Sequence, residues 1–216
     1  SVPSATASSA AVSPGDSTAG WRSLFDGQTL AGWRGYKETS PPKGWAVKNG
    51  AIVREGEGGD LITDEAFGNF ELALEWMISR GGNSGILYRV TEAGEKTYVS
   101  GPEMQVLDDE KHVDGKSPLT SAGALYGLYP APRGALKPVG EWNAIRIVAN
   151  GDHVEHWLNG VKMADAEIGS PDWNQRVAGT KFAVWPGYAK AARGHIALQD
   201  HGDWVAFRNI RIRVLP

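Results

Sequence analysis

The sequence predicts an all-β protein, built as two antiparallel sheets packed into a sandwich. Short apolar runs separated by Gly, Pro and Asn-Gly turns recur from Trp21 to the C-terminus. The 28 Gly and 12 Pro among 216 residues favour many turns over long helices. Within several runs apolar and polar residues alternate with a period of two, which is the pattern of a strand with one buried face.

Ten segments have this strand pattern: residues 46–47, 51–54, 70–79, 85–90, 103–108, 142–150, 153–158, 181–184, 195–199 and 205–214. Asn49-Gly50 and Asn150-Gly151 each separate two of these segments, and each is a strong hairpin signal. Asn159-Gly160 predicts a third turn, followed by a short strand over residues 161–163.

Helices are expected only as short pieces, around residues 64–67 and 171–177. So many strands with so little helical periodicity favour a sandwich or a barrel. No internal repeat is present, so residues 21–216 are expected to form a single β-sandwich domain.

The first twenty residues are almost all Ser, Ala, Thr, Pro and Gly. Such a segment buries too little apolar surface to offset its ordering entropy, so residues 1–20 are expected to be a flexible tail. The tail has neither the basic start nor the apolar centre of a signal peptide. It is typical of a segment that follows a removed signal or a lipid anchor, which favours a secreted or periplasmic location.

Composition excludes several classes of function. The net charge is -3, from 22 basic and 25 acidic residues, without the basic stripe that nucleic-acid binding requires. Cysteine is absent, which excludes disulfides and thiolate metal sites. No apolar run approaches the roughly 20 residues of a membrane-spanning helix. The sequence does not indicate an oligomeric state.

Alternation along the strands separates a core set from a polar set. In residues 70–79, one face carries Phe70, Leu72, Leu74, Trp76 and Ile78, which are predicted to be core. The opposite positions of this strand and of the later ones are repeatedly polar. They are predicted to gather on one shared surface: Glu75, Arg89, Glu103, Gln105, Gln199, His201 and Arg208.

Candidate site residues fall at three places along this polar set. Asn83 and Ser84 precede the strand that carries Arg89, and they could bind sugar hydroxyls, with Arg89 on a carbonyl or carboxylate. Glu103 and Gln105 are neighbours on one strand face, which suits a base beside a hydrogen-bonding amide. The competing interpretation of each group is an ordinary turn or a solvated polar strand face.

The segment that follows Gln199 is the densest titratable cluster. His201 could act as a general base, because an imidazole titrates near neutral pH. Alternatively Asp200, His201 and Asp203 could hold a metal, although their spacing matches no standard motif. A turn that uses Asp and Gly for backbone reasons is the third interpretation.

Aromatic residues add two further candidates. The nine Trp are numerous enough that some could stack on sugar rings, while most should fill the core or its rim, and Trp185 is a candidate for such stacking. Tyr126 lies in a Gly-rich loop that could cover a site.

Taken in order, the motifs resemble those of the 3-keto-disaccharide hydrolase family, also described as 3-keto-glucoside lyase/hydratase. The matching motifs, in chain order, are LFDG at 24–27, LAGW at 30–33, FEL at 70–72, GNSG at 82–85, EMQVLD at 103–108, GALY at 123–126, GEWN at 140–143, WLNG at 157–160, GHIALQDHG at 194–202 and FRNI at 207–210. The resemblance runs from about Trp21 to the C-terminus. Met77 is a departure, since the family often has Arg there.

The resemblance implies a concanavalin-A-like jelly roll with a sugar site on its concave sheet, and glycosides oxidised at C3 as substrates. A C3 ketone acidifies the C2 proton, so a base can remove it, the C1 aglycone leaves and water adds to the enone. The expected catalytic residues are Glu103 or His201 as the base and Arg89 as the enolate stabiliser, with a divalent metal as the alternative stabiliser. The expected substrate-binding residues are Glu75, Asn83, Ser84, Gln105, Tyr126, Gln199 and Trp185.

Two other functions remain open from the sequence. A non-catalytic carbohydrate-binding module is the first, because this type of fold serves lectins as readily as enzymes. A conventional glycoside hydrolase using Glu75 and Glu103 is the second. The two-acid strand motif of concanavalin-like β-glucanases is absent, so this alternative ranks third, after the 3-keto-glycoside enzyme and the binding module.

Overall fold

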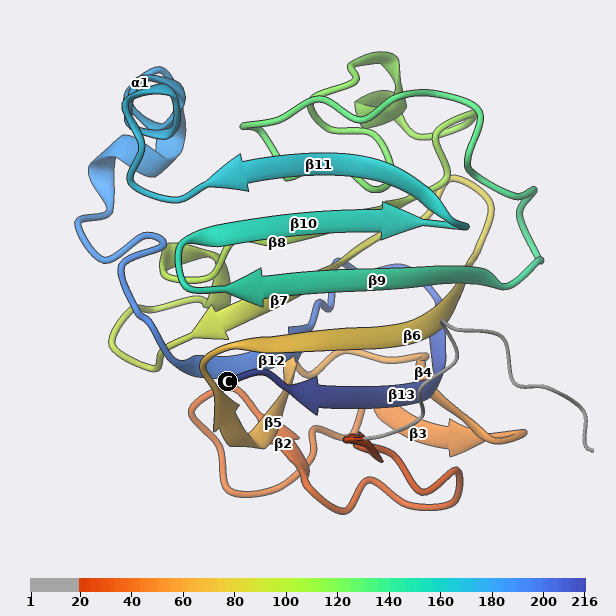
Figure 1. Ribbon diagram of the computed structural model, residues 1–216. Coiled ribbons are helices and arrows are strands. Elements are labelled where there is room, and N and C mark those ends of the chain that lie inside the picture. The colour runs from red at the N-terminus through yellow and green to blue at the C-terminus, as the bar shows by residue number, and fades with distance from the viewer. Residues whose placement is uncertain (1–19) are drawn as a thin grey trace, which may run out of the picture.

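A computed structural model describes residues 20–216 as two packed antiparallel sheets (Figure 1). In this part of the chain one sheet has eight strands in the order β11-β10-β9-β6-β13-β4-β3, with β1 paired to β13. The other has five strands in the order β2-β5-β12-β7-β8. The predicted all-β sandwich is confirmed.

The bounds of the elements are as follows. The eight-stranded sheet contains β1 (Trp21–Ser23), β3 (Trp45–Lys48), β4 (Ala51–Arg54), β6 (Phe70–Ile78), β9 (Asn143–Asn150), β10 (His153–Leu158), β11 (Val161–Glu167) and β13 (Val205–Val214). The five-stranded sheet contains β2 (Trp33–Gly35), β5 (Leu61–Phe67), β7 (Asn83–Val90), β8 (Glu103–Leu107) and β12 (Gly194–Leu198). The helical pieces are α1 (Pro171–Ala178) and the 3-10 helices η1 (Thr97–Val99), η2 (Val113–Lys116) and η3 (Lys181–Val184).

The two sheets enclose a core made by the predicted apolar faces. The alternate residues of β6 that were predicted to be core are at most 3% exposed: Phe70, Leu72, Leu74, Trp76 and Ile78. From the other sheet Tyr88 packs edge-on against Phe70, with 6.3 Å between ring centroids. The Tyr88 hydroxyl also lies 3.1 Å from Nε2 of His156 on β10, so one polar contact joins the sheets inside the core.

Two of the predicted hairpin turns have the backbone that Asn-Gly provides. Asn49 and Gly50 have φ values of 51° and 74°, and Asn159 and Gly160 have 48° and 82°. Positive φ at both central residues characterises the type I′ turn, whose twist matches that of paired strands.

Two local predictions were wrong. Residues 64–67 form the end of β5, where Ala66 pairs with His195 and Phe67 with Gly194, so sheet pairing overrides the helical preference of this segment. Residues 181–184 form η3 instead of a strand, with the hydroxyl of Thr180 accepting a hydrogen bond from the Phe182 N–H. Periodicity alone does not distinguish a helix from a strand in a segment of only four residues.

The expected N-terminal tail lies outside the described residues, except for Gly20. Between residues 20 and 216, no helix is long and apolar enough to cross a membrane. The predicted helix near residue 171 is present as α1 and lies with η3 at one end of the sandwich, at the upper left of Figure 1.

Candidate active site

The predicted pair Glu103 and Gln105 lies on β8, on the side of the five-stranded sheet that faces away from the core. Glu103 pairs with Leu87 and Gln105 with Gly85 on β7. The backbone N–H of Gln199, just after β12, donates to the carbonyl oxygen of Gly85 at 3.0 Å, which brings the end of β12 to the same place. We call the surface formed by Asn83, Glu103, Gln105 and Gln199 the polar face.

Gly85 lies on the polar face beside Gln105, and the Glu103 side chain occupies the space that a side chain at position 85 would need. A Cβ added to Gly85 would be only 2.1 Å from Oε1 of Glu103. Real Cβ atoms do not approach other atoms so closely, so glycine at this position leaves the room in which the carboxyl group sits.

Glu103 is buried, with 7% of its surface exposed. Burial, reinforced by the negative charge of Asp60, raises the pKa of Glu103 to about 8, while the positive charge of Lys181 acts in the opposite direction. Within the described chain no side chain donates a hydrogen bond to this carboxyl group. A carboxyl group whose pKa lies near neutrality can exchange protons with a substrate at physiological pH.

Three buried amide oxygens on the polar face have no hydrogen-bond partner within the described residues: Oδ1 of Asn83, Oε1 of Gln105 and Oε1 of Gln199. The other end of Gln105 is fixed, since its Nε2 donates to the carbonyl oxygen of Thr120 at 2.9 Å. An unsatisfied buried polar atom costs about 1–3 kcal/mol. Their concentration around one carboxyl group is typical of a site whose ligand carries hydroxyl donors.

An aromatic wall stands beside Glu103. The rings of Trp185 and Tyr98 are 5.5 Å apart. Those of Tyr126 and Phe182 are 6.5 Å apart. The Tyr126 backbone N–H donates to the Glu103 carbonyl oxygen at 2.9 Å, so the predicted loop residue lies next to the acid. Aromatic faces of this kind stack on sugar rings.

A cavity of about 470 Å³ opens at the edge of this surface. Its lining includes three residues that the sequence singled out, Gln199, Asp200 and His201, and others from distant segments: Tyr36, Asp60, Lys96, Thr97 and Tyr98. This volume lies in the range of small-molecule sites.

Asp60 is a partly buried acid that lines this cavity. Burial raises the pKa of Asp60, and hydrogen bonds from Thr97 and from the Asp200 backbone oppose that effect. Its Oδ1 accepts the Asp200 N–H at 2.8 Å, and its Oδ2 accepts the Thr97 hydroxyl. Asp60, the residue before β5, therefore ties the start of this strand to the loop that carries His201.

The loop after Gln199 is held by its acids and presents His201 to solvent. Asp200 forms a buried ion pair with Arg54, with 2.6 Å between Oδ1 and Nε. Oδ2 of Asp203 accepts the Asn83 backbone N–H at 2.9 Å. In residues 20–216 these acids do not converge with His201 on a common point, so the proposed Asp200–His201–Asp203 metal set is wrong.

Arg89 and Ser84 have positions unlike those predicted. Arg89 has a φ of 51°, which breaks the alternation of β7, and its Nε donates to the carbonyl oxygen of Gly68 at 3.3 Å in the β5–β6 turn. Arg89 is thus directed to the end of the sandwich and not onto the polar face. Ser84 is fully buried, and its hydroxyl donates to the Gln199 carbonyl oxygen at 2.8 Å, so it holds β7 to β12.

Glu75 does not share a surface with Glu103. It lies on β6 in the eight-stranded sheet, where Arg208 on β13 pairs with it at 3.1 Å between Nε and Oε2. Asn209 also donates to this carboxylate. The prediction of one polar surface was wrong for Glu75 and Arg208, because strand alternation does not reveal which sheet a strand joins.

One group of possible metal ligands occurs in the described part of the chain, at His153, Glu155 and Asp165. It lies on β10 and β11 of the eight-stranded sheet, away from the polar face. Nζ of Lys162 already contacts Glu155 at 3.2 Å and Asp165 at 2.6 Å. The polar face and this group are therefore separate.

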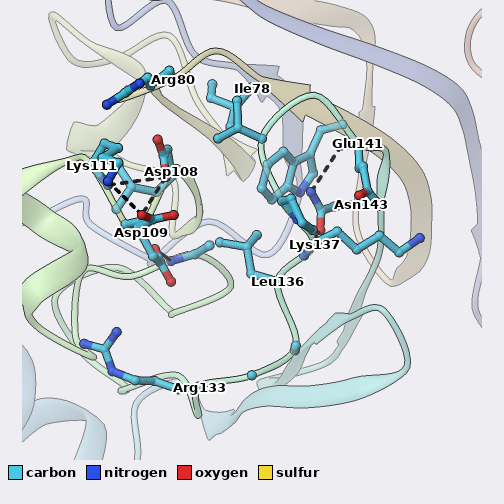
Figure 2. A pocket seen from close by; sticks show the side chains of 18 of the residues that line it. Ile78, Arg80, Asp108, Asp109, Lys111, Arg133, Leu136, Lys137, Glu141 and Asn143 are labelled. Atoms are coloured by element: carbon cyan, nitrogen blue, oxygen red, sulfur yellow. Dashed lines mark hydrogen bonds and ion pairs between the residues drawn. The ribbon is translucent and has the colours of Figure 1, made fainter.

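The larger cavity, about 660 Å³, contains none of the predicted site residues. Figure 2 shows Leu136 from the 130–139 loop across from Asp109, with Ile78 on another wall. Asp109 accepts the Ala122 N–H at 2.7 Å, and burial raises its pKa.

Asp60, Tyr98 and Lys181 are the site residues that the sequence did not reveal. Asp60 is 37 positions from Thr97 and 140 from Asp200, so nothing local in the sequence links them. Lys181 was placed in an expected strand that is instead η3.

Comparisons with known proteins identify the family of this chain. The family model described as "3-keto-alpha-glucoside-1,2-lyase-like domain" matches residues 20–213. A 3-keto-disaccharide hydrolase from Bacteroides thetaiotaomicron is 36% identical, over 91% of this chain and 79% of that protein.

Two solved structures support the architecture. A chain from Parabacteroides distasonis named "putative glycosyl hydrolase" is 33% identical, covers 91% of this chain and 94% of its own, and has a TM-score of 0.85. The β-glucanase of Bacillus licheniformis is 9% identical with a TM-score of 0.52 over 92% of this chain and 100% of its own, so it shares the jelly-roll fold alone. The chain therefore belongs to the 3-keto-α-glucoside-1,2-lyase-like family.

Proposed function

We propose that this protein is a carbohydrate-active enzyme that cleaves glycosides carrying a ketone at C3. Membership of the family and the similarity to a named 3-keto-disaccharide hydrolase support the substrate class. The observation that carries the chemistry is the buried carboxyl group of Glu103, which lies over Gly85. Burial raises the pKa of this carboxyl group to about 8. A carboxylate with such a pKa is a stronger base than an exposed one.

In this proposal Glu103 removes the proton at C2 of the sugar. The C3 ketone makes this proton acidic, because the electron pair of the broken C–H bond moves onto the ketone oxygen. The oxygens of Asn83, Gln105 and Gln199 accept hydrogen bonds from sugar hydroxyls, which satisfies atoms that otherwise lack partners. Trp185 and Tyr126 cover the ring from the aromatic wall.

The leaving group departs from C1 when the enolate electrons return to form the C1–C2 double bond. His201, exposed at the cavity rim, protonates the departing oxygen. Water then adds to the enone, placing hydroxyl at C1 and hydrogen at C2. The sum of the steps is hydrolysis, with elimination and hydration as its two halves.

The decisive experiment compares an aryl 3-keto-glucoside with its unoxidised parent glucoside. We expect release of the aryl group from the 3-keto compound only, with transient ultraviolet absorbance from the enone. Equal cleavage of both compounds would favour conventional glycoside hydrolysis. Saturable binding of both compounds without cleavage of either would favour a carbohydrate-binding module.

Conventional hydrolysis by Glu75 and Glu103 has little support from the geometry. The two acids of a glycosidase lie about 5–10 Å apart across one bond. Glu75 and Glu103 belong to different sheets, on β6 and β8.

A further inference from the structure

Removal of the C2 proton leaves a negative charge on the oxygen at C3, and this charge needs a positive partner. Arg89 was the expected partner, but it is directed to the β5–β6 turn. Another cation must act on the polar face if the protein itself supplies the charge. Of the charges that act on Glu103, those of Asp60 and Asp114 are negative and that of Lys181 is positive.

Lys181 is the first residue of η3, where Thr180 fixes the start of the helix. Its Nζ lies 5.0 Å from the ring centroid of Tyr126, 5.7 Å from that of Phe182 and 5.8 Å from that of Tyr98. Three aromatic rings thus face one ammonium group, an arrangement in which each ring attracts the charge.

The Lys181 ammonium group has no acidic partner within residues 20–216, whereas Lys48 is paired with Glu55 and Lys162 with Asp165. Rings hold the cation in place without neutralising it. Lys181 is also exposed, so a ligand on the polar face can reach it. A fixed, unneutralised and accessible charge beside a base is suited to stabilising an anion that forms during the reaction.

We propose that the ammonium group of Lys181 stabilises the enolate oxygen formed at C3, an inference that rests on the proposed function. Glu103 takes the C2 proton, and the C–H electron pair moves through the C2–C3 bond onto the ketone oxygen, facing Lys181. The pair then returns and expels the C1 oxygen, which gains a proton from His201. Lys181 keeps its own protons throughout, and no covalent bond forms to it.

The test compares Lys181→Met and Lys181→Arg with Lys190→Met, an exposed lysine nine residues further along. With the 3-keto-glucoside, we expect Lys181→Met to lower kcat by about 100-fold, the size seen when one group that stabilises an oxyanion is removed. KM should change little, Lys181→Arg should recover most of the rate, and Lys190→Met should match the wild type. Equal rates for Lys181→Met and wild type would overturn the proposal.

A second readout does not require turnover. The pKa of Glu103, followed by carbon NMR of the labelled carboxyl group, should rise in Lys181→Met because a favourable positive charge is lost. An unchanged pKa would mean that Lys181 does not act on the polar face. This readout separates the proposed function from the proposed role of Lys181. If the wild-type protein does not cleave the 3-keto-glucoside but the pKa of Glu103 still rises in Lys181→Met, the proposed reaction is wrong and the placement of Lys181 beside Glu103 is right.

Two further outcomes would contradict this role. Borohydride trapping of the 3-keto sugar on Lys181 would show that the lysine acts through a covalent imine. Loss of activity with a chelator, restored by a divalent ion, would show that a metal supplies the positive charge.

Discussion

The carboxyl group of Glu103 lies directly above Gly85, where a Cβ would approach Oε1 to 2.1 Å. The glycine and the acid are on neighbouring strands but are two positions out of register, because Gly85 pairs with Gln105 and Glu103 pairs with Leu87. The position of the acid thus depends on the absence of a side chain on the adjacent strand.

Gly85→Ala is therefore expected to displace the Glu103 carboxyl and to lower kcat by about 100-fold or more, since small misplacements of catalytic groups have effects of this size. The control is Gly187→Ala, because a Cβ at Gly187 meets no atom within 4 Å. Near-ultraviolet circular dichroism should show that both variants are folded. Full activity in folded Gly85→Ala would separate Glu103 from catalysis.

Stability should fall as pH rises from about 4.5 to about 8 because of Glu103. Its folded-state pKa is raised, chiefly by burial, from 4.5 to about 8, so the unfolded chain loses its proton first. The stabilisation is complete below pH 4.5 and is lost as pH passes the folded-state value. At about 1.4 kcal/mol per pKa unit, the loss is on the order of 5 kcal/mol.

Denaturant unfolding at pH 5 and pH 8.5 measures this effect. The side chain in Glu103→Gln cannot titrate. The free energy of unfolding of this variant, relative to that of the wild type, should therefore rise between pH 5 and pH 8.5. The matched substitution Glu75→Gln should not show this difference. A gap between wild type and Glu103→Gln that is the same at both pH values would contradict the raised pKa.

His201→Ala should matter most for poor leaving groups. An alkyl alcohol needs a proton as it departs, whereas nitrophenolate leaves readily without one, so the loss in kcat should be about 100-fold for an alkyl 3-keto-glucoside and small for the nitrophenyl compound. The measurement is kcat for both substrates with each enzyme. An equal loss for both would assign His201 to binding instead of proton transfer.

Glu75→Gln is expected to leave turnover unchanged. Glu75 lies on the eight-stranded sheet, paired with Arg208 and Asn209. A partly exposed ion pair contributes about 0–1 kcal/mol, so unfolding should shift only slightly. Steady-state kinetics on the 3-keto-glucoside check this, and a large fall in kcat would return Glu75 to the site.

Much of the polar face was predictable because strand alternation is local. Glu103 and Gln105 alternate with Met104 and Val106, and the structure buries those two in the core. The ordered motifs that resemble the family also led to the correct fold.

The wrong predictions concern features that depend on contacts between residues far apart in the sequence. The sheet that contains Glu75 depends on pairing with β9 and β13, which lie far along the chain. The positive φ of Arg89 turned its side chain out of the expected alternation. Lys181 lies on η3 and Asp60 lies in the loop before β5. No short sequence pattern reveals which distant residues these two segments contact. Export to the periplasm or the medium stays a prediction.

The most direct test of the central claim is transfer of solvent hydrogen to C2. The 3-keto-glucoside is cleaved in D₂O and the product is examined at early times by proton NMR and mass spectrometry. If Glu103 removes the C2 proton and water later adds to the enone, wild-type product carries one deuterium at C2 and Glu103→Gln forms almost none. Wild-type product that is cleaved but keeps its original hydrogen at C2 would contradict elimination and the role of Glu103 as the base.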